Sequence, residues 1–380
     1  MKNKYIIEIN SIIERDSKDS TYKFALLRGI IDIIIEYPQL VITDKENNRL
    51  ILPFGLLVFS WIFYYYPVFS SPYFIPQKNG ENQIRNQLAI RKPFNDFIKL
   101  YEHRGGIESF YNDFKRNRIP DDVQKSLKKL VTKIATTIKT MPMKYLGYSY
   151  FGSYNQVAWH NNDAKNISPG FSFRGYESTD ILGTFNIPLK YFPVFENLGR
   201  YILGNSSLLS KWTDFTMNLK TARSQDNKCF YELLLKSPNT ERNVRYVKSI
   251  LKNRIIYCVW SGKKLNDYAL DHIIPFSIWP NNFLWNLLPS SKSINLNKSD
   301  FIPEKETLLK SKERILYYWD IYSSTNETLF SQEIKYSLAG FSYGADRFFD
   351  NCFDRLTERC LYFIKQGCRP WNYTIQNAGG

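Results

Sequence analysis

The chain has 380 residues, enough for two or three domains that each bury their own core. With 51 lysines and arginines against 36 aspartates and glutamates, the formal net charge is +15, which favours a polyanionic partner: DNA, then RNA, then an anionic membrane. The five cysteines are odd in number and form no CxxC pair, which argues against a disulfide framework or a zinc ribbon and favours reduced thiols in a cytoplasmic protein.

The N-terminal region begins with a clear helical pattern. Residues 20–37 place apolar side chains at helical spacing behind Ser20 and Thr21, so we expect a helix that ends before Pro38. Residues 41–52 predict a hairpin that turns at two asparagines. Helix, hairpin and a following apolar helix are similar to the parts of a winged-helix module, by a loose analogy.

One uncharged stretch is long enough to be weighed as a membrane span. Residues 51–71 carry no charge, but Pro53, Gly55 and Pro67 interrupt them. We therefore expect a buried core helix near residues 56–66 and no membrane partner.

Residues 115–139 hold eight lysines and arginines against two aspartates. Their apolar side chains recur on one face, which predicts an amphipathic helix with a basic surface. A solvated face is the commoner role of such a surface, and contact with phosphates is the functional one. Lys128 and Lys129 are the candidate substrate contacts.

The middle of the chain is rich in tyrosine, phenylalanine, glycine and asparagine. Residues 144–151 and 169–176 alternate as strands do, and residues 188–219 return to a helical pattern. His160 is expected in a loop and His103 near a turn, both as structural residues.

Residues 255–300 predict a compact unit of two strands, a long loop and a short helix. The first strand covers residues 255–265 with a turn at Ser261-Gly262, and the second covers residues 268–274. Ser290 or Ser291 is the expected N-cap of the helix. Asp271 and His272 then end the second strand, and Asn295 faces them from the helix.

These residue types suit phosphodiester hydrolysis. His272 can take a proton from water near neutral pH. A hard divalent cation prefers oxygen ligands, here Asp271 and the amide oxygen of Asn295. Asn286 is placed to hold the loop and orient the histidine, and Lys298 to reach a phosphate.

The unit resembles the HNH (ββα-metal) endonucleases in their Asp-His, Asn, Asn variant, over about 50 of the 380 residues. His272 precedes Asn286 by 14 positions, and Asn286 precedes Asn295 by 9. The residues that carry the resemblance are Cys258-x-Trp260-Ser261-Gly262-Lys263-x-Leu265, Asp271-His272-x-Ile274-Pro275, Leu284-Trp285-Asn286-Leu287-Leu288-Pro289 and Asn295-x-x-Lys298-Ser299-Asp300.

The resemblance implies His272 as general base, Asp271 and Asn295 as ligands of one Mg²⁺ or Mn²⁺ ion, and Asn286 as the structural asparagine. Lys263 and Lys298 are added as substrate contacts. The implied products carry 5′-phosphate and 3′-hydroxyl ends. The tryptophan-containing segments are similar to a subset found in restriction and phage-defence nucleases.

Two departures from the family pattern matter. Ser261 stands where many relatives have the second cysteine of a zinc pair, so no structural zinc is expected. Asn295 stands where others have histidine, and an amide oxygen favours magnesium or manganese over transition metals.

We expect an α+β protein in which a ββα-metal unit is embedded in a helical C-terminal domain. The expected parts are residues 1–140, helical and binding DNA or a partner; 141–235, mixed; and 236–380, the nuclease with core 255–300 and closing helices. DNA is the expected partner, with a homodimer or a defence-system protein as a further one. The alternatives are an inactive HNH fold in a DNA-binding scaffold, and an RNase.

Overall fold

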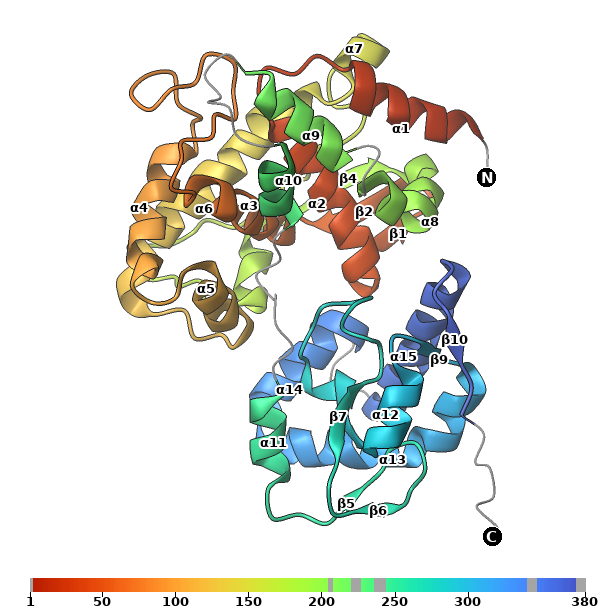
Figure 1. The fold of residues 1–380 in the computed structure, drawn as a ribbon. Coiled ribbons are helices and arrows are strands. Elements are labelled where there is room, and N and C mark those ends of the chain that lie inside the picture. Colours follow the sequence, from red (N-terminus) through yellow and green to blue (C-terminus); the bar gives the residue numbers. More distant parts are fainter. Residues whose placement is uncertain (1–2, 204–207, 220–226, 236–243, 340–346, 374–380) are drawn as a thin grey trace. The chain divides into compact units, whose positions relative to one another are not determined.

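The structure is a computed structural model that describes residues 3–203, 208–219, 227–235, 244–339 and 347–373. The chain divides into two compact units, residues 1–238 and 239–380 (Figure 1). The two expected parts 1–140 and 141–235 thus fall within one unit. The α+β class, with small sheets among many helices and the HNH region after a helical N-terminal part, is confirmed.

Unit 1, residues 1–238, is mostly helical. Its described helices are α1 (Asn3–Arg15), α2 (Tyr22–Glu36), α3 (Phe54–Phe69), α4 (Arg91–Glu102), α5 (Gly106–Lys115), α6 (Gln124–Ile138), α7 (Tyr148–Phe151), α8 (Phe192–Leu203), α9 (Leu208–Met217) and α10 (Asn227–Leu235). Its strands are β1 (Ile42–Asp44), β2 (Arg49–Pro53), β3 (Trp159–His160) and β4 (Thr184–Pro188).

The four strands of unit 1 form one antiparallel sheet in the order β1-β2-β4-β3. The hairpin β1–β2 turns at Asn47 and Asn48 as expected, with Asn48 at a left-handed φ of 53°. Strand β2 also pairs with β4 over its whole length, Leu50 opposite Ile187 and Leu52 opposite Phe185. This long-range pairing joins the expected first and middle parts into one unit.

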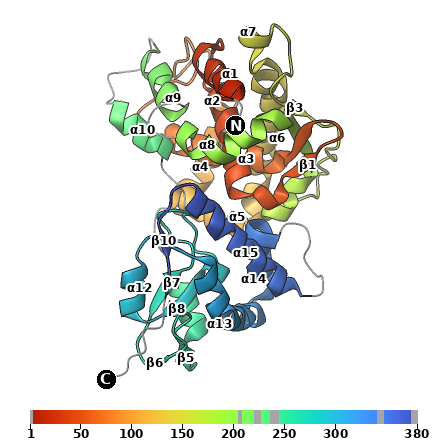
Figure 2. The ribbon, with the colours of Figure 1, turned by 90° about the vertical axis from the view of Figure 1, so that its right-hand side faces the viewer.

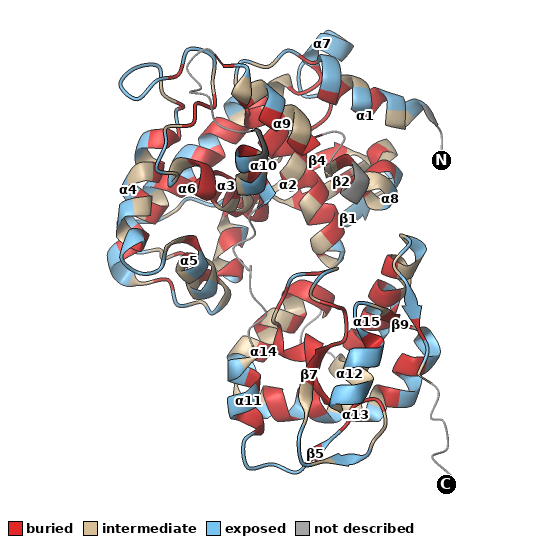
Figure 3. Ribbon diagram, in the orientation of Figure 1, coloured by how far each residue is buried: buried red, intermediate tan, exposed pale blue. Residues whose placement is uncertain are grey.

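Two apolar helices form the centre of unit 1. Helix α2 begins after Thr21 and ends at Glu36, before Pro38, as predicted. Helix α3 is buried along most of its length, drawn in red in Figure 3, and contains the predicted core segment. Among the described residues, no helix combines the length and the apolarity needed to cross a bilayer.

The prediction of strands in residues 144–151 and 169–176 is wrong. Gly147 and Gly152 adopt left-handed φ values of 80° and 70° and enclose the short helix α7. At Phe173, the side chain of Gln124 supplies the partners that a strand would: Phe173 N donates to Gln124 Oε1 at 2.9 Å, and Gln124 Nε2 donates to Phe173 O at 2.8 Å. Alternating aromatic residues in these two segments therefore mark loops and a short helix. His160, expected in a loop, lies in β3.

Unit 2, residues 239–380, contains the predicted nuclease region. Its described helices are α11 (Arg245–Leu251), α12 (Lys292–Lys298), α13 (Lys305–Thr325), α14 (Glu327–Ile334) and α15 (Phe348–Lys365). Its strands are β5 (Ile256–Tyr257), β6 (Lys264–Leu265), β7 (Ala269–His272), β8 (Leu287–Ser290), β9 (Ile302–Pro303) and β10 (Pro370–Trp371).

The centre of unit 2 is an antiparallel pair, β7 and β8, followed at once by α12 (Figure 2). Ser291 is the N-cap of α12, and its hydroxyl accepts the N–H of Ile294, as the sequence predicted. Strand β8 was not predicted, because residues 287–290 are buried throughout and lack the alternation of a half-exposed strand. The ββα unit therefore consists of β7, β8 and α12, while β5 and β6 form a separate two-residue ladder.

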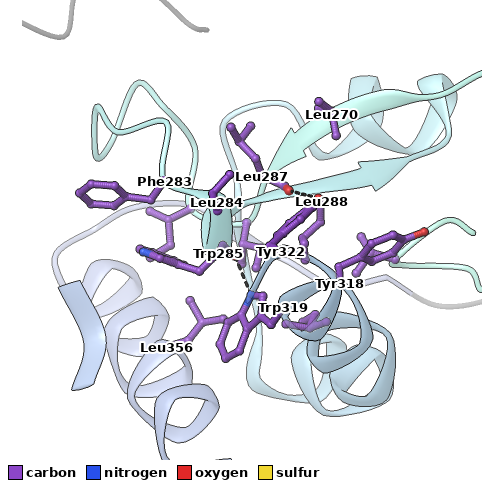
Figure 4. Packing of buried hydrophobic residues seen from close by; sticks show 14 of the residues in the cluster. Leu270, Phe283, Leu284, Trp285, Leu287, Leu288, Tyr318, Trp319, Tyr322 and Leu356 are labelled. Carbon is purple, nitrogen blue, oxygen red and sulfur yellow. Dashed lines mark hydrogen bonds between the residues drawn. The ribbon is translucent and has the colours of Figure 1, made fainter. Parts of the chain in front are cut away.

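The aromatic core beneath β8 holds this unit in place (Figure 4). Trp319 on α13 donates from Nε1 to the carbonyl of Trp285 at 2.9 Å, and Tyr322 donates to the carbonyl of Leu287 at 2.8 Å. Both contacts satisfy backbone oxygens at the point where the chain enters β8. The closing helices expected after residue 300 thus position the ββα unit as well as covering it.

Candidate active site

Asp271 and His272 end strand β7 and line one pocket of about 320 Å³ together with Asn295 of α12. The wall of the pocket is completed by Pro275, Phe276, Ser277, Leu296, Ser299 and Asp300. Three residues placed together by the sequence pattern thus meet at one opening.

Both carboxylate oxygens of Asp271 are fixed by neighbours. Trp260 donates from Nε1 to Oδ2 at 2.7 Å, and Lys298 donates from Nζ to Oδ1 at 3.1 Å. Asp271 is 3% exposed and Lys298 fully buried, so water does not compete for these bonds. A carboxylate has about four lone-pair sites, so each oxygen keeps room for a second partner.

His272 is held at both its backbone and its ring. Lys298 donates to its carbonyl oxygen at 2.6 Å. The ring lies 5.5 Å from that of Phe276, centroid to centroid, and its Nε2 lies 3.4 Å from Oδ1 of Asn282. The imidazole therefore sits at the pocket wall with its orientation restrained on two sides.

Asn286 ties the loop after β7 to the entry of β8. Its side chain accepts the N–H of Ile274 at 2.8 Å and donates to the carbonyl of Ile274 at 3.0 Å. Its own carbonyl accepts the N–H of Ile273 at 2.8 Å. Asn286 is fully buried, and these bonds fix the backbone just after His272.

The turn that presents Trp260 is itself anchored. Arg314 of α13 donates to the carbonyls of Val259, at 2.6 Å, and Trp260, at 3.1 Å. Cys258 is buried, and its sulfur accepts the backbone N–H groups of Ser261 and Ser291. Burial alone would raise the pKa of this thiol, but the hydrogen bonds outweigh it and lower the pKa.

The four lysines expected as substrate contacts differ in their exposure and in their hydrogen bonds. Lys263 and Lys129 are exposed, although Lys263 does not line the pocket. Lys128 donates to the carbonyl of Pro169 at 2.7 Å. Lys298 is buried on Asp271, because it lies three residues after Asn295 and so shares the inner face of α12. The expected phosphate contact of Lys298 does not fit this burial, and we correct it.

Sequence reasoning missed several features of the site. Trp260 and Lys298 both belong to the motif, but nothing in its spacing showed that they meet on Asp271. Asn282 lies in the long loop, where no periodic signal exists. Arg314 lies 54 residues after Trp260, and only the folded chain brings it to the turn.

The oxygen donors at the pocket suit a hard cation. Asp271 offers a carboxylate and Asn295 an amide oxygen, and the side chain of Asn295 makes no hydrogen bond within the described part of the chain. No group of three or more histidine, cysteine, aspartate or glutamate side chains gathers there or elsewhere among the described residues. The donors present fit a cation that takes its remaining ligands from water and substrate.

The pocket on a ββα unit, with Asp-His on the first strand and asparagine on the helix, defines an HNH nuclease domain. Residues 258–304 match the family model described as HNH endonuclease, which implies nuclease activity and nucleic-acid binding. The chain as a whole belongs to the family defined by a domain of unknown function, DUF8808, whose model matches residues 2–234. No curated protein and no solved structure matches the chain significantly.

Proposed function

We propose that this protein is a metal-dependent endonuclease that hydrolyses DNA phosphodiester bonds and leaves 5′-phosphate and 3′-hydroxyl ends. The observation that carries the proposal is the convergence of Asp271, His272 and Asn295 on one pocket. By analogy with the nuclease subset that it resembles, we assign it to restriction or phage defence, acting alone, as a homodimer or with a defence-system partner.

His272 acts as the general base. Its imidazole takes a proton from a water molecule, the water oxygen forms a bond to phosphorus, and the bond from phosphorus to the 3′ oxygen breaks. The departing 3′ oxygen takes up a proton from solvent. The ring contacts with Phe276 and Asn282 keep the imidazole in place for this transfer.

Asp271 and Asn295 would hold one Mg²⁺ or Mn²⁺ ion. Such an ion supplies positive charge that offsets the charge building up on the phosphate and on the leaving oxygen. The oxygen donor set favours these ions over zinc.

Two further residues position the reacting groups without contacting substrate. Lys298 holds Oδ1 of Asp271 and the carbonyl of His272, so one ammonium group aligns both residues. Asn286 fixes the backbone of Ile274. Lys263 and Lys129 remain the candidate phosphate contacts, because both are exposed.

The test is cleavage of supercoiled plasmid with magnesium or manganese, beside the same reactions with EDTA. We expect nicked or linear DNA only when the metal is present. DNA ligase should reseal the nicks without a kinase step, because hydrolysis leaves 5′-phosphate ends. Cleavage of matched RNA but not of DNA would show that the protein is an RNase. Binding of DNA without cleavage would favour a DNA-binding scaffold with an inactive HNH fold.

A further inference from the structure

A second surface, in unit 1, combines a row of lysines with a cluster of exposed tyrosines. Residues 124–162 contain six lysines and no aspartate or glutamate. Lys125, Lys129 and Lys133 follow one another at four-residue spacing on α6, and all three are exposed. None of them forms an ion pair with a residue that the structure describes.

The three lysines of this row lower the stability of the helix. Like charges four residues apart on a helix repel each other by about 0.2–0.5 kcal/mol per pair. The opposite face of α6 is buried, so the three lysines stay at the surface, and the helix geometry keeps them close to one another. A polyanion along the row would convert this repulsion into attraction.

The helical path continues from α6 through the π-helical segment Lys139–Met143 and reaches the tyrosines. The rings of Tyr148 and Tyr154 stack with centroids 4.8 Å apart and planes 18° apart. Tyr145 packs edge-on against Tyr154 at 5.1 Å. Lys144 places a further cation in this cluster, with its Nζ 4.8 Å from the ring centroid of Tyr154.

The tyrosines are exposed although they pack on one another. Tyr148 is 41% exposed, Tyr150 50% and Tyr154 44%, and the ribbon of α7 is largely pale blue in Figure 3. Apolar side chains gathered in one exposed patch mark an interaction surface, whereas single exposed ones need no explanation. The exposed part of the Tyr148–Tyr154 stack suits flat, polarisable partners such as nucleobases.

The cluster is held rigidly from below. The buried carboxylate of Asp16 accepts the backbone N–H groups of Gly147, at 2.9 Å, and Ser149, at 3.1 Å. Lys23 pairs with the same carboxylate at 2.7 Å. Gly147 has a φ of 80°, and a Cβ there would lie 2.8 Å from the side chain of Val157, so a residue with a side chain would not fit at this position without strain. A rigid aromatic platform loses little conformational entropy when a ligand binds.

The charge around the cluster also points to an anionic ligand. The carboxylates of the adjacent helix α1, and Asp16 just after it, are already paired: Glu8 with Lys190, Glu14 with Lys211 and Asp16 with Lys23. They therefore do little to offset the lysines of residues 124–144.

We propose that this surface binds an unpaired strand of nucleic acid, with phosphates along the lysine row and bases stacked on Tyr148 and Tyr154. A duplex keeps its base faces covered by their neighbours, whereas an unpaired strand offers both phosphates and free base faces. The proposal does not depend on cleavage by unit 2, and its failure would leave the proposed active site of Asp271, His272 and Asn295 untouched.

The test is binding of a fluorescein-labelled oligo(dT) strand to the full chain in EDTA, beside a strand of equal length without bases. The variant Tyr148→Ala/Tyr154→Ala should weaken oligo(dT) binding by about tenfold or more, since stacking contributes strongly to each bound base. The matched variant Tyr148→Phe/Tyr154→Phe keeps the rings and should bind as the wild type does. The strand without bases should bind wild type and Ala variant alike.

The triple variant Lys125→Gln/Lys129→Gln/Lys133→Gln should weaken both probes and reduce the salt slope by about 0.7 for each phosphate that it no longer neutralises. Unchanged oligo(dT) binding in the Tyr-to-Ala variant would overturn the proposal, as would no oligo(dT) binding by the wild type. An equal loss for both probes would overturn the stacking role. Capture of a protein partner that depends on the same tyrosines, without oligo(dT) binding, would reassign the surface to that partner.

Discussion

The buried ammonium of Lys298 is the group on which the geometry of the candidate site depends most. It lies between the carboxylate of Asp271 and the carbonyl of His272, and no part of its side chain reaches solvent. Removing one partner of a buried pair leaves the other charge without compensation, which costs far more than the loss of a surface pair.

Lys298→Met should therefore destabilise the nuclease unit by about 3–5 kcal/mol, measured by urea unfolding. The control is Lys292→Met on the same helix, where the lysine pairs with Asp267 at the surface and the change should cost at most about 1 kcal/mol. Equal effects of the two substitutions would show that the buried pair does not hold the site together.

The two asparagines of the motif should respond differently to truncation. Asn286→Ala leaves the buried N–H and C=O of Ile274 without partners. It should therefore lower the free energy of unfolding by about 2 kcal/mol or more and also lower the rate of cleavage. Asn295→Ala removes a half-exposed pocket side chain and should lower cleavage while the free energy of unfolding stays within about 0.5 kcal/mol. Loss of stability in Asn295→Ala would argue that this residue is structural.

At the scale of elements, prediction succeeded where a local signal exists. Helix α2 has an apolar face and a following proline, and α12 has a serine N-cap whose side chain forms the expected bond. Strand β8 has no such signal, because all four of its residues are buried. The strand-like pattern of residues 169–176 gave a wrong prediction. The side chain of Gln124, far away in sequence, forms the hydrogen bonds with the backbone N–H and C=O of Phe173 that a neighbouring strand would form.

Helix α15 makes a prediction about thiol chemistry. Cys352 and Cys360 face the core, and burial raises the pKa of each thiol to about 12. Only the thiolate reacts readily, so neither should be alkylated by iodoacetamide in the native protein at about pH 8. Cys229, exposed on α10, is the internal control and should label quickly. Mass spectrometry that found Cys352 labelled as fast as Cys229 would contradict the packing of α15.

At the scale of the whole molecule, the sequence revealed one unit far better than the other. In unit 2, Asp271, His272, Asn286 and Asn295 have the order and spacing of the HNH motif, so the candidate site was predicted from these residues. In unit 1, the sheet depends on the pairing of β2 with β4, more than 130 residues apart. No local pattern encodes such a pairing, and the boundary expected at residues 140 and 141 falls inside a continuous helical path.

The net charge of +15 predicts salt-dependent binding of duplex DNA. Lys129→Gln should reduce the slope of log affinity against log salt by about 0.9 if its exposed ammonium contacts a phosphate. Lys128→Gln is the neighbouring control, because its ammonium is bound to the carbonyl of Pro169. Filter binding over a range of salt concentrations measures both, and equal slopes would remove Lys129 from the DNA contacts.

The most direct test of the central claim is the rate of plasmid nicking by His272→Ala in magnesium, beside the wild type and His103→Ala. His103 is an exposed histidine at the end of α4, so its loss controls for the removal of an imidazole. We predict that His272→Ala loses at least about 100-fold in rate, as expected for a missing general base, while His103→Ala nicks at the wild-type rate. Nicking by His272→Ala at the wild-type rate would contradict the assignment of the active site.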